Sequence, residues 1–410
     1  MTTTTQVPID LWSSASFSRG HPIEQYRWLL QNAPVHWHDA PEEVGGGFWV
    51  VTSHELVKEV SSQNNLFSSH AGAIMLYDLS EEQLHGARAM MLNMDPPQHN
   101  RYRKLVGPQF IPKRAYQWQA DIDETASQII DEVCEQGECD LVADIAGKLP
   151  SYVVAKLLGI PVEVGVRLYD LTEIMHSAMD SVTAEQRMQV AQEYQAFTAE
   201  LHAEKTANPG DDLASKLAHA EVDGHKLTSQ EYQAFITLLV NAGGDTTRGL
   251  VGGGVVSLIQ QPEILARFRA NAEELMPTAV DELLRYQSPV VHMRRTATED
   301  TTLGGIPIAA GDKVAMFYAA ANRDPSVFEN PDELMLDRDP NPHVAFGGGG
   351  PHFCLGSHFA RIEIAAAFTQ ILARLQDLEL TEDPVWVPSN FTCGPQRAPI
   401  KFTPSPKLAG

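Results

Sequence analysis

A cysteine preceded by a run of glycines is the part of this sequence best suited to chemistry. Residues 346–356 read FGGGGPHFCLG, and apolar residues then recur at helical spacing from Phe359 to Leu375. Cys354 is therefore expected where a glycine loop meets the N-terminus of a helix. Free backbone N–H groups and the helix dipole favour a thiolate there, so we expect a lowered thiol pKa. The alternative is a simple glycine turn before an amphipathic helix with a buried cysteine.

Two glycines and three polar residues interrupt a second, otherwise apolar stretch. Residues 243–247 read GGDTT and follow a helix start whose capping box is Thr228 and Glu231. Glycine inside a helix costs about 1 kcal/mol relative to alanine, and polar side chains on a buried helix are also unfavourable. We expect the helical hydrogen-bond ladder to open here and another group to lie against it. Close packing of two helices at small residues is the alternative.

Charged residues at helical spacing form two further candidate pairs. Glu282 and Arg285 are three residues apart and share one helix face. His99 and Arg103 are four apart, which suits them to bind one carboxylate together. Taken alone, either pair is also typical of a solvated surface, where an ion pair contributes under about 1 kcal/mol.

Four motifs in this order resemble those of the cytochromes P450, and the resemblance extends over nearly the whole chain. They are DPPQH at 95–99, AGGDT at 242–246, ExxR at 282–285 and the cysteine loop at 346–356. In that family the cysteine thiolate ligates haem iron. The resemblance implies that Cys354 is the metal ligand, that Phe346 shields its sulfur and that Gly356 belongs to the same haem-binding loop. Phe346 stands eight residues before Cys354 instead of the usual seven, as in a subgroup of bacterial members.

The same resemblance assigns roles to the other candidates. Haem carries two propionates, which need cationic partners. The remaining cofactor-binding residues that it implies are His99, Arg103, Ala242, Arg295 and His352. Glu282 and Arg285 would be joined by Arg338 in a buried ionic network that is structural and locks the cysteine loop.

The function that the resemblance implies is that of a haem-thiolate monooxygenase. Such an enzyme binds haem b and inserts one oxygen atom from O2 into a C–H bond of a small hydrophobic substrate. Asp245 and Thr246 would be the catalytic residues that deliver protons. No GxGxxG fingerprint occurs in context, so electrons from NAD(P)H must arrive through a [2Fe-2S] or similar ferredoxin and its reductase. A peroxide-using peroxygenase of the same fold and a non-catalytic haem or gas-binding protein are the alternatives.

Mostly apolar segments are expected to line the substrate pocket, with adaptable methionines among them. The resembling subgroup includes enzymes that act on terpenoids, branched lipids and sterols, so we expect a substrate of one of these classes. The predicted pocket residues are Met75, Leu76, Met90, Met94, Met179, Leu239, Val290, Val291, Met293 and Phe391.

The elements around these residues predict a mainly α, α+β fold, the cytochrome P450 fold. Residues 114–287 are almost continuously helical, and the helix that starts after Thr228 is expected to be long, buried and central. Strand-like runs lie near the N-terminus and after Pro289, starting with Val290–Val291, and we expect them to meet beside the helices.

The organisation of the chain is otherwise simple. We expect a polar leader over residues 1–20 and one haem-thiolate domain over 21–410. Residues 67–94 have poor periodicity and are expected to form a long functional loop.

Composition supports a globular protein and excludes some functions. The 410 residues are 43% hydrophobic and 20% charged, which provides a sizeable core. A net charge of −23 argues against nucleic acid as a partner. The N-terminal sequence lacks the regions of a signal peptide and no apolar run reaches the ~20 residues of a membrane span, so we expect a cytoplasmic protein. We also expect a monomer. The four cysteines have no zinc-site spacing and fit reduced thiols.

A local basic patch is expected despite the acidic total. An acidic ferredoxin would dock on it, although the same charges could instead be scattered and solvated. Its members would be Arg101, Lys104, Lys113, Arg114 and Arg361.

Overall fold

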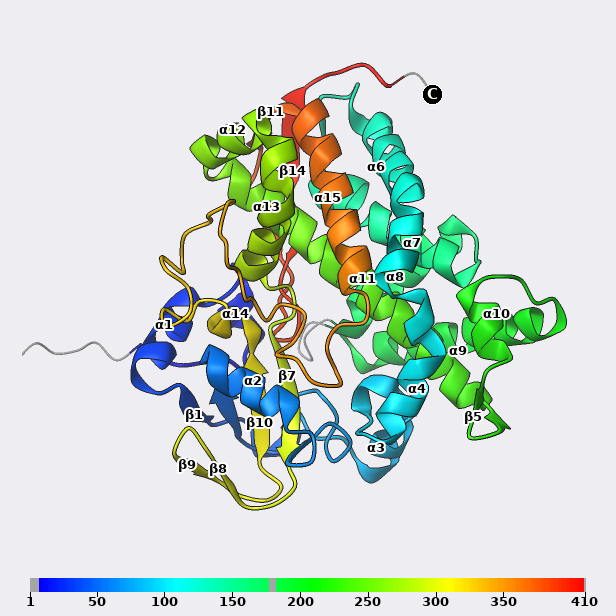
Figure 1. Ribbon diagram of the computed structural model, residues 1–410, viewed down its shortest axis with the longest axis vertical. Coiled ribbons are helices and arrows are strands. Elements are labelled where there is room, and N and C mark those ends of the chain that lie inside the picture. The colour runs from blue at the N-terminus through cyan, green and yellow to red at the C-terminus, as the bar shows by residue number, and fades with distance from the viewer. Residues whose placement is uncertain (1–6, 177–181, 409–410) are drawn as a thin grey trace, which may run out of the picture.

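The computed structural model describes residues 7–176 and 182–408 of the chain. Helices make up most of the molecule, and the largest sheet, which includes β1, β7 and β10, lies at the lower left of Figure 1. The mainly α, α+β architecture predicted from the sequence is confirmed.

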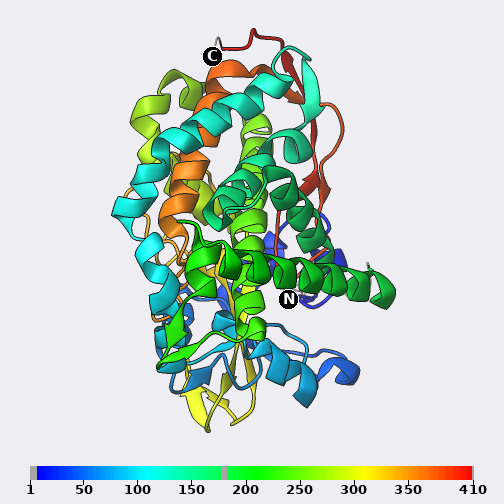
Figure 2. The same cartoon turned by 90° about the vertical axis from the view of Figure 1, so that its right-hand side faces the viewer.

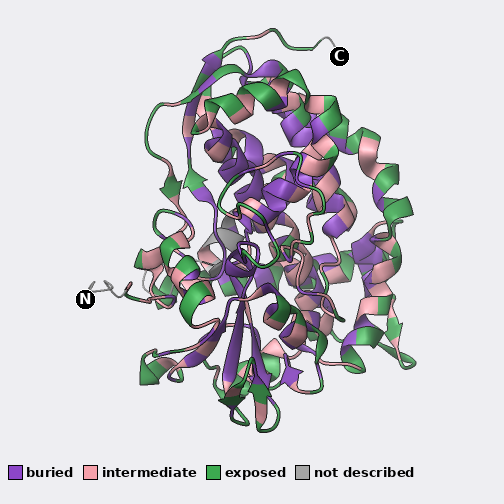
Figure 3. Ribbon diagram, turned by 60° about the vertical axis from the view of Figure 1, so that its left-hand side comes forward, coloured by how far each residue is buried: buried purple, intermediate pink, exposed green. Residues whose placement is uncertain are grey.

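Strands from both ends of the chain form one five-stranded sheet, as expected. Its order is β1-β2-β10-β7-β3, in which β2 and β10 are parallel and the other pairs are antiparallel. Figure 3 shows β7 and β10 as largely buried strands. The strands are β1 (Val35–His38), β2 (Phe48–Val51), β3 (Phe67–Ser68), β7 (His292–Ala297) and β10 (Lys313–Phe317).

The predicted helical stretch of residues 114–287 is confirmed, with short interruptions. These are β4 (Glu138–Asp140), a π-helical turn (Val142–Ala146) and the hairpin of β5 (Glu221–Val222) and β6 (His225–Lys226). The helices of the chain are α1 (Ile23–Asn32), α2 (His54–Ser62), α3 (Glu81–Ala87), α4 (Gln98–Val106), α5 (Pro112–Ala115), α6 (Gln119–Val133), α7 (Lys148–Leu158), α8 (Val162–His176), α9 (Ala184–Ala207), α10 (Leu213–Ala218), α11 (Ser229–Ile259), α12 (Pro262–Ala270), α13 (Ala272–Gln287), α14 (Tyr318–Ala321) and α15 (Ser357–Arg374).

Helix α3 lies inside the segment that we expected to be an irregular loop. Ser80 accepts a hydrogen bond from the amide of Gln83, whose side chain accepts one from the amide of Ser80. This capping box provides partners for two N–H groups at the start of the helix. Because the helix has no buried residue, apolar periodicity could not reveal it.

The long central helix is α11, which has 31 residues and the expected capping box at Thr228 and Glu231. It is crossed by α9 (Figure 2). The helix is unbroken at Gly243, so the expected opening of its hydrogen-bond ladder is wrong. A Cβ on Gly243 would lie 2.6 Å from a methyl group of Val154 on α7. The glycine permits close approach of two helices, which was the alternative explanation.

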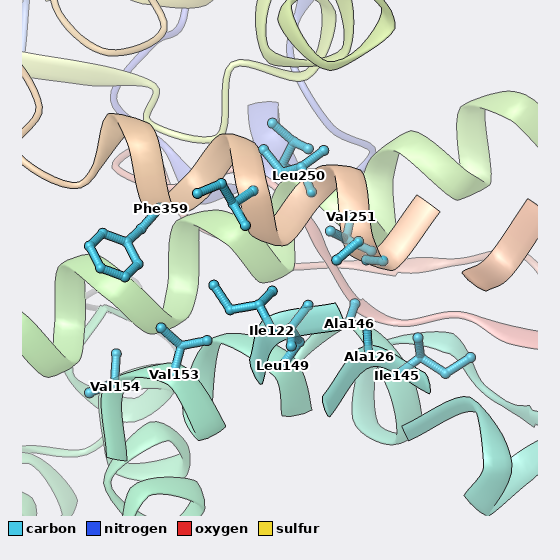
Figure 4. Packing of buried hydrophobic residues seen from close by; sticks show 14 of the residues in the cluster. Ile122, Ala126, Ile145, Ala146, Leu149, Val153, Val154, Leu250, Val251 and Phe359 are labelled. Carbon is cyan, nitrogen blue, oxygen red and sulfur yellow. The ribbon is translucent and has the colours of Figure 1, made fainter. Parts of the chain in front are cut away.

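The main core lies where α11 meets α6, α7 and α15. Figure 4 shows Leu250 and Val251 of α11 near Ile122 of α6, Leu149 of α7 and Phe359 of α15. This packing fixes the relative orientation of α11 and α15. Helix α11 carries candidate site residues, and α15 directly follows the cysteine loop.

The C-terminal strands form smaller sheets. Val290–Val291 is not a strand, since Val290 makes only an isolated bridge to Thr392. The remaining strands are β8 (Thr301–Leu303), β9 (Ile306–Ile308), β11 (Gln376–Leu380), β12 (Val385–Trp386), β13 (Pro395–Arg397) and β14 (Pro399–Thr403). No single described helix is long and apolar enough to cross a membrane. Among the described residues, one sharply bent pair of helices, Val142–Leu158 with Val162–Leu168, reaches that length and composition when the two are counted together.

Candidate active site

The glycine run before Cys354 lies directly against α2. A Cβ on Gly348 would stand 2.9 Å from the Cβ of Ser61, and one on Gly350 would stand 2.5 Å from the Ser61 carbonyl oxygen. The Ser61 hydroxyl donates a hydrogen bond of 2.9 Å to the carbonyl of Gly349. Side chains on these glycines would push the loop away from α2, so the glycines determine where Cys354 lies.

Cys354 ends this loop, and its amide donates a 2.9 Å hydrogen bond to the carbonyl of Phe346. Burial raises the pKa of the thiol, and the backbone of Gly356 and the charges of Arg103 and Arg361 oppose this effect only in part. The expected lowering of the pKa is therefore wrong for the protein alone, because desolvation outweighs the helix terminus. A metal cation deprotonates a thiol that coordinates it, so a bound metal would reverse this preference.

Phe346 is held beside Cys354 by its backbone and by Arg361. The guanidinium of Arg361 lies 4.6 Å from the centre of the Phe346 ring, within the range of a cation–π contact. Arg361 also pairs with Asp281 at 2.8 Å. The ring of Phe353 packs against Phe346 at 6.3 Å. Phe346 thus has a fixed position in the cysteine loop.

Four basic side chains from α4, β7 and the cysteine loop converge near Cys354. His99 lies on α4 and His352 in the cysteine loop, with ring centres 4.2 Å apart. Arg295 of β7 is 2% exposed, and Arg103 of α4 donates to the carbonyl of Phe353 at 2.7 Å. Burial and the nearby charges of Arg295 and His99 lower the pKa of His352 to about 2. The sequence had assigned all four residues to one ligand.

Two atoms of this cluster lack the hydrogen bonds that burial demands. Among the described residues, neither Nε of Arg295 nor Nδ1 of His352 has a partner. Leaving such a group unpaired costs about 1–3 kcal/mol. Asp95, whose charge acts on Arg295, bonds instead to Ser68 and to the amide of Ser69. The arrangement suits an anion with several oxygens, and the haem propionates implied by the motifs fit it.

One stretch of α11 is uncovered although the helix around it is buried. Ala242 is exposed and Thr246 is half-buried, whereas residues on the other faces of the helix are buried. The Thr246 hydroxyl donates to the carbonyl of Ala242 at 3.0 Å. Its lone pairs are therefore available to a further donor. This stretch of α11 is therefore accessible to a bound group.

Asp245 is paired with a residue to which the sequence had given no role. An oxygen of Asp245 accepts a 2.7 Å bond from Arg248, and both side chains are at most 5% exposed. The spacing of three on one helix was a signal for this contact. The carboxylate is thus held by a cation beside Thr246.

A second ionic network holds the segment that leads to the cysteine loop. Arg285 donates two bonds of 2.8 Å to Glu282, and Arg338 donates one of 3.0 Å to the same carboxylate. Arg285 also donates to three carbonyl oxygens between residues 322 and 333. Both Glu282 and Arg285 are completely buried. Such a network fixes the irregular segment only while all its members are present.

The predicted pocket residues divide into two groups. Leu76 and Val291 pack in the core that includes Phe48 and Phe317, and Met94 and Phe391 are also buried. Met179 lies outside the described residues. The residues that keep open surface are Met75, Met90, Leu239, Val290 and Met293.

The predicted basic patch is smaller than expected. Arg101 forms an ion pair with Asp223, and Arg361 pairs with Asp281. Lys104, Lys113 and Arg114 remain exposed. Three large apolar side chains are also exposed in the same segments and in the cysteine loop: Ile111, Tyr116 and Phe353.

Comparison with known proteins decides what this arrangement is. The sequence model of the family "Cytochrome P450" matches residues 149–402. The chain belongs to the cytochrome P450 family. The P450 fold expected from the motifs is therefore confirmed, and the P450 match includes α11, the ionic network and the cysteine loop.

Related P450s of known function are similar over most of their length. A steroid C26-monooxygenase of Rhodococcus jostii is 35% identical over 370 residues, 88% of this chain and 78% of that protein. A methyl-branched lipid omega-hydroxylase of Mycobacterium tuberculosis is 37% identical over 385 residues, 92% of this chain and 90% of that protein. The structure of the Mycobacterium marinum P450 CYP268A2 in complex with pseudoionone superposes with a TM-score of 0.89 at 35% identity and covers 98% of this chain and 100% of that one.

This P450 is accordingly a monooxygenase that hydroxylates a hydrophobic substrate. When bound, its haem b activates O2 with electrons that come from NAD(P)H through redox partners. The protein itself supplies the binding, the orientation and the proton-bearing groups.

Proposed function

We propose that Cys354 holds the haem iron and that His99, Arg103, Arg295 and His352 bind the propionates. The observation that carries the proposal is that two buried atoms beside the cysteine loop, Arg295 Nε and His352 Nδ1, have no hydrogen-bond partner among the residues that the structure describes. A single ligand with two carboxylates and a metal would satisfy both atoms and the thiolate.

Asp245 and Thr246 are proposed to hold and move protons at the uncovered stretch of α11. Thr246 directs its hydrogen to Ala242, so its oxygen can accept a hydrogen bond from water or a bound ligand. The ion pair with Arg248 holds the carboxylate of Asp245 in place beside Thr246. This acid–alcohol pair is the feature that a peroxide-using enzyme of the same fold would lack.

The absorbance of the reduced, CO-treated protein tests the ligand assignment. We expect a band near ~450 nm in the wild type and its loss in Cys354→Ser, because only a thiolate ligand gives that band. A band near ~420 nm in the freshly prepared wild type would contradict the proposal.

The substrate class is proposed to be a branched aliphatic lipid or steroid side chain. The two related enzymes are named for oxidation at the end of a methyl-branched lipid and at C26 of a steroid, which are both ends of branched alkyl chains. The open surfaces of Met75, Leu239, Val290 and Met293 suit such a chain.

A panel of ligands tests this class. A methyl-branched fatty acid, a steroid with an alkyl side chain and pseudoionone are added separately, and the change of haem spin state and the position of the new hydroxyl are recorded. Hydroxylation only within a ring or at the middle of a straight chain would contradict the proposed class.

The electron donor is proposed to be a [2Fe-2S] or similar ferredoxin, which docks where Lys104, Lys113 and Arg114 are exposed. The protein is proposed to work as a cytoplasmic monomer. Sedimentation of the holoenzyme at working concentration tests the monomer.

A further inference from the structure

An irregular, partly buried segment runs from Gly72 to Leu79, between β3 and α3. It contains no helix or strand, although Ala73, Ile74 and Leu76 are at most 7% exposed. Buried backbone without secondary structure must find hydrogen-bond partners elsewhere. We call residues 72–79 the wall segment.

Arg294 of β7 provides most of these partners. Its amide donates to the carbonyl of Ile74 at 3.0 Å, and its guanidinium donates to the carbonyls of Met75 and Tyr77, both at 3.2 Å. The same nitrogen bonds to Asp78 at 2.6 Å. One side chain therefore holds three residues of the wall segment.

Lys313 of β10 completes the set from the neighbouring strand. Its ammonium donates to the carbonyl of Leu76 at 3.2 Å and to that of Gly46 at 3.3 Å, and lies 3.4 Å from Asp78. Four successive carbonyls, from Ile74 to Tyr77, thus bond to two adjacent strands. Arg294 and Lys313 are 4% and 5% exposed on their side chains, so these bonds are shielded from water.

Two glycines make room for this cluster. A Cβ on Gly72 would lie 2.3 Å from a guanidinium nitrogen of Arg294, and a Cβ on Gly45 would lie 2.0 Å from an oxygen of Asp78. Gly45 also has a φ of 95°, a conformation that other residues rarely adopt. Gly72 therefore leaves room for the guanidinium of Arg294, and Gly45 leaves room for the carboxylate of Asp78.

Arg294 and the proposed propionate contact Arg295 lie on opposite faces of β7. Arg294 and Arg295 are consecutive in β7, so their side chains leave opposite faces of the strand. Arg295 lies with His352, whereas Arg294 binds the wall segment. At its start the wall segment follows Ser69, whose hydroxyl is 3.4 Å from His352. Met75 keeps open surface, and its own carbonyl is one of those that Arg294 holds.

We propose that Arg294 and Lys313 are positioning residues that fix residues 72–79 as a rigid wall of the substrate pocket. The inference rests on the proposed function, because it takes Met75 to face the substrate. The two cations hold the backbone in place, and Met75 then presents a constant surface to a ligand beside the haem. Loosening the wall segment weakens ligand binding and leaves the haem–thiolate bond intact.

Amide hydrogen exchange of residues 73–78 in the holoenzyme tests the first step. In Arg294→Met and in Lys313→Met these amides are expected to exchange at least tenfold faster. The change should be larger in Arg294→Met, because this substitution removes more hydrogen bonds to the wall segment. Asp78→Asn removes only a half-exposed carboxylate and should change exchange by less than threefold. If Arg294→Met does not yield folded holoenzyme, the comparison of Lys313→Met with Asp78→Asn decides.

Binding of 4-phenylimidazole, read from the shift of the haem absorbance, tests the second step. We expect at least fivefold weaker binding in Lys313→Met, with the CO band still near ~450 nm. Arg374→Met is a matched control. Arg374, the last residue of α15, is also buried and donates a hydrogen bond to the backbone carbonyl of Ser127 on α6. It should change neither quantity.

Unchanged exchange in both Arg294→Met and Lys313→Met, or faster exchange with unchanged affinity, would overturn the inference. A wild-type band near ~420 nm would overturn the proposed ligand assignment instead, and the exchange comparison would still stand.

Discussion

At the scale of single residues, burial shifts the pKa values of groups near the proposed haem site. It raises the pKa of the Cys354 thiol and lowers those of His99 and His352. A group in such surroundings must be neutral, paired or bound to a ligand. Glu282 and Asp245 are paired, whereas Cys354 and the histidines are suited to receive the haem.

Asp245→Asn tests the role of the paired carboxylate. General acid–base groups contribute about 10²–10⁴-fold, so we expect turnover to fall at least about tenfold, with more peroxide released per NAD(P)H. Product and peroxide are measured together, in H2O and in D2O. Asp131→Asn is the matched control, because Asp131 is also paired with a buried arginine, Arg374, but lies away from the site. Equal turnover and isotope effects in wild type and Asp245→Asn would exclude a proton-transfer role.

Glu363 of α15 gives a prediction about pH. It is buried, one of its oxygens has no partner among the described residues, and burial raises its pKa from 4.5 to about 8. Between these values the folded state binds more protons than the unfolded state, so stability falls as pH rises from 4.5 to 8. Glu363→Gln should therefore unfold like the wild type near pH 4.5 and be more stable above pH 8, by an amount on the order of a few kcal/mol.

Urea unfolding of the holoprotein across this pH range measures the difference. Glu124→Gln, an exposed carboxyl on α6, is the control and should show no such dependence. A constant difference between Glu363→Gln and wild type at all pH values would show that Glu363 does not titrate in this range.

At the scale of elements, the cysteine loop is held from two directions. Helix α2 supports its glycines, and the network of Glu282, Arg285 and Arg338 fixes the segment before it. Helix α15 then carries the chain away into the core. The position of Cys354 therefore depends on elements far apart in the sequence.

Gly348→Ala tests the contact between loop and α2. A Cβ would come within 2.9 Å of both the Val57 carbonyl oxygen and the Ser61 Cβ, and the backbone there cannot yield as a flexible side chain would. We expect a loss of about 1–3 kcal/mol in stability and faster conversion of the ~450 nm band to ~420 nm. Gly107→Ala, where a Cβ meets nothing within 4 Å, is the control and should be neutral or slightly stabilising. Equal conversion rates in the two variants would refute the role of this contact.

At the scale of the whole molecule, a strongly acidic protein presents a few exposed cations near the cysteine loop. The net charge is −23, while Lys104, Lys113 and Arg114 remain unburied around α4 and α5. Local charge of this kind steers an acidic partner in spite of the unfavourable total.

Reversal of this charge tests the docking site. In Lys113→Glu/Arg114→Glu we expect a severalfold higher KM for ferredoxin at low salt, and the difference should shrink as salt screens the charges. Lys401→Glu on β14 is the control for a charge reversal away from this surface. Identical ferredoxin dependence and salt dependence in wild type and the double variant would rule out this surface.

The sequence by itself determined the local features of this protein. The glycine run, the capping box of α11, its length and the ExxR spacing depend on residues close together in the chain, so residue types and periodicity were sufficient. The motif order then gave the fold and the chemistry. The sequence did not show α3, whose signal is a capping box alone, or the close packing at Gly243, which depends on Val154 of another helix.

Only the tertiary structure decided which charged groups meet. Arg248 joins Asp245, Arg101 is lost from the basic patch to Asp223, and Arg294 and Lys313 converge on the wall segment from two strands. The pKa of Cys354 changed direction for the same reason, because desolvation depends on everything packed around a group. Sequence spacing fixes neighbours within one helix or strand, whereas burial and long-range pairing depend on the path of the whole chain.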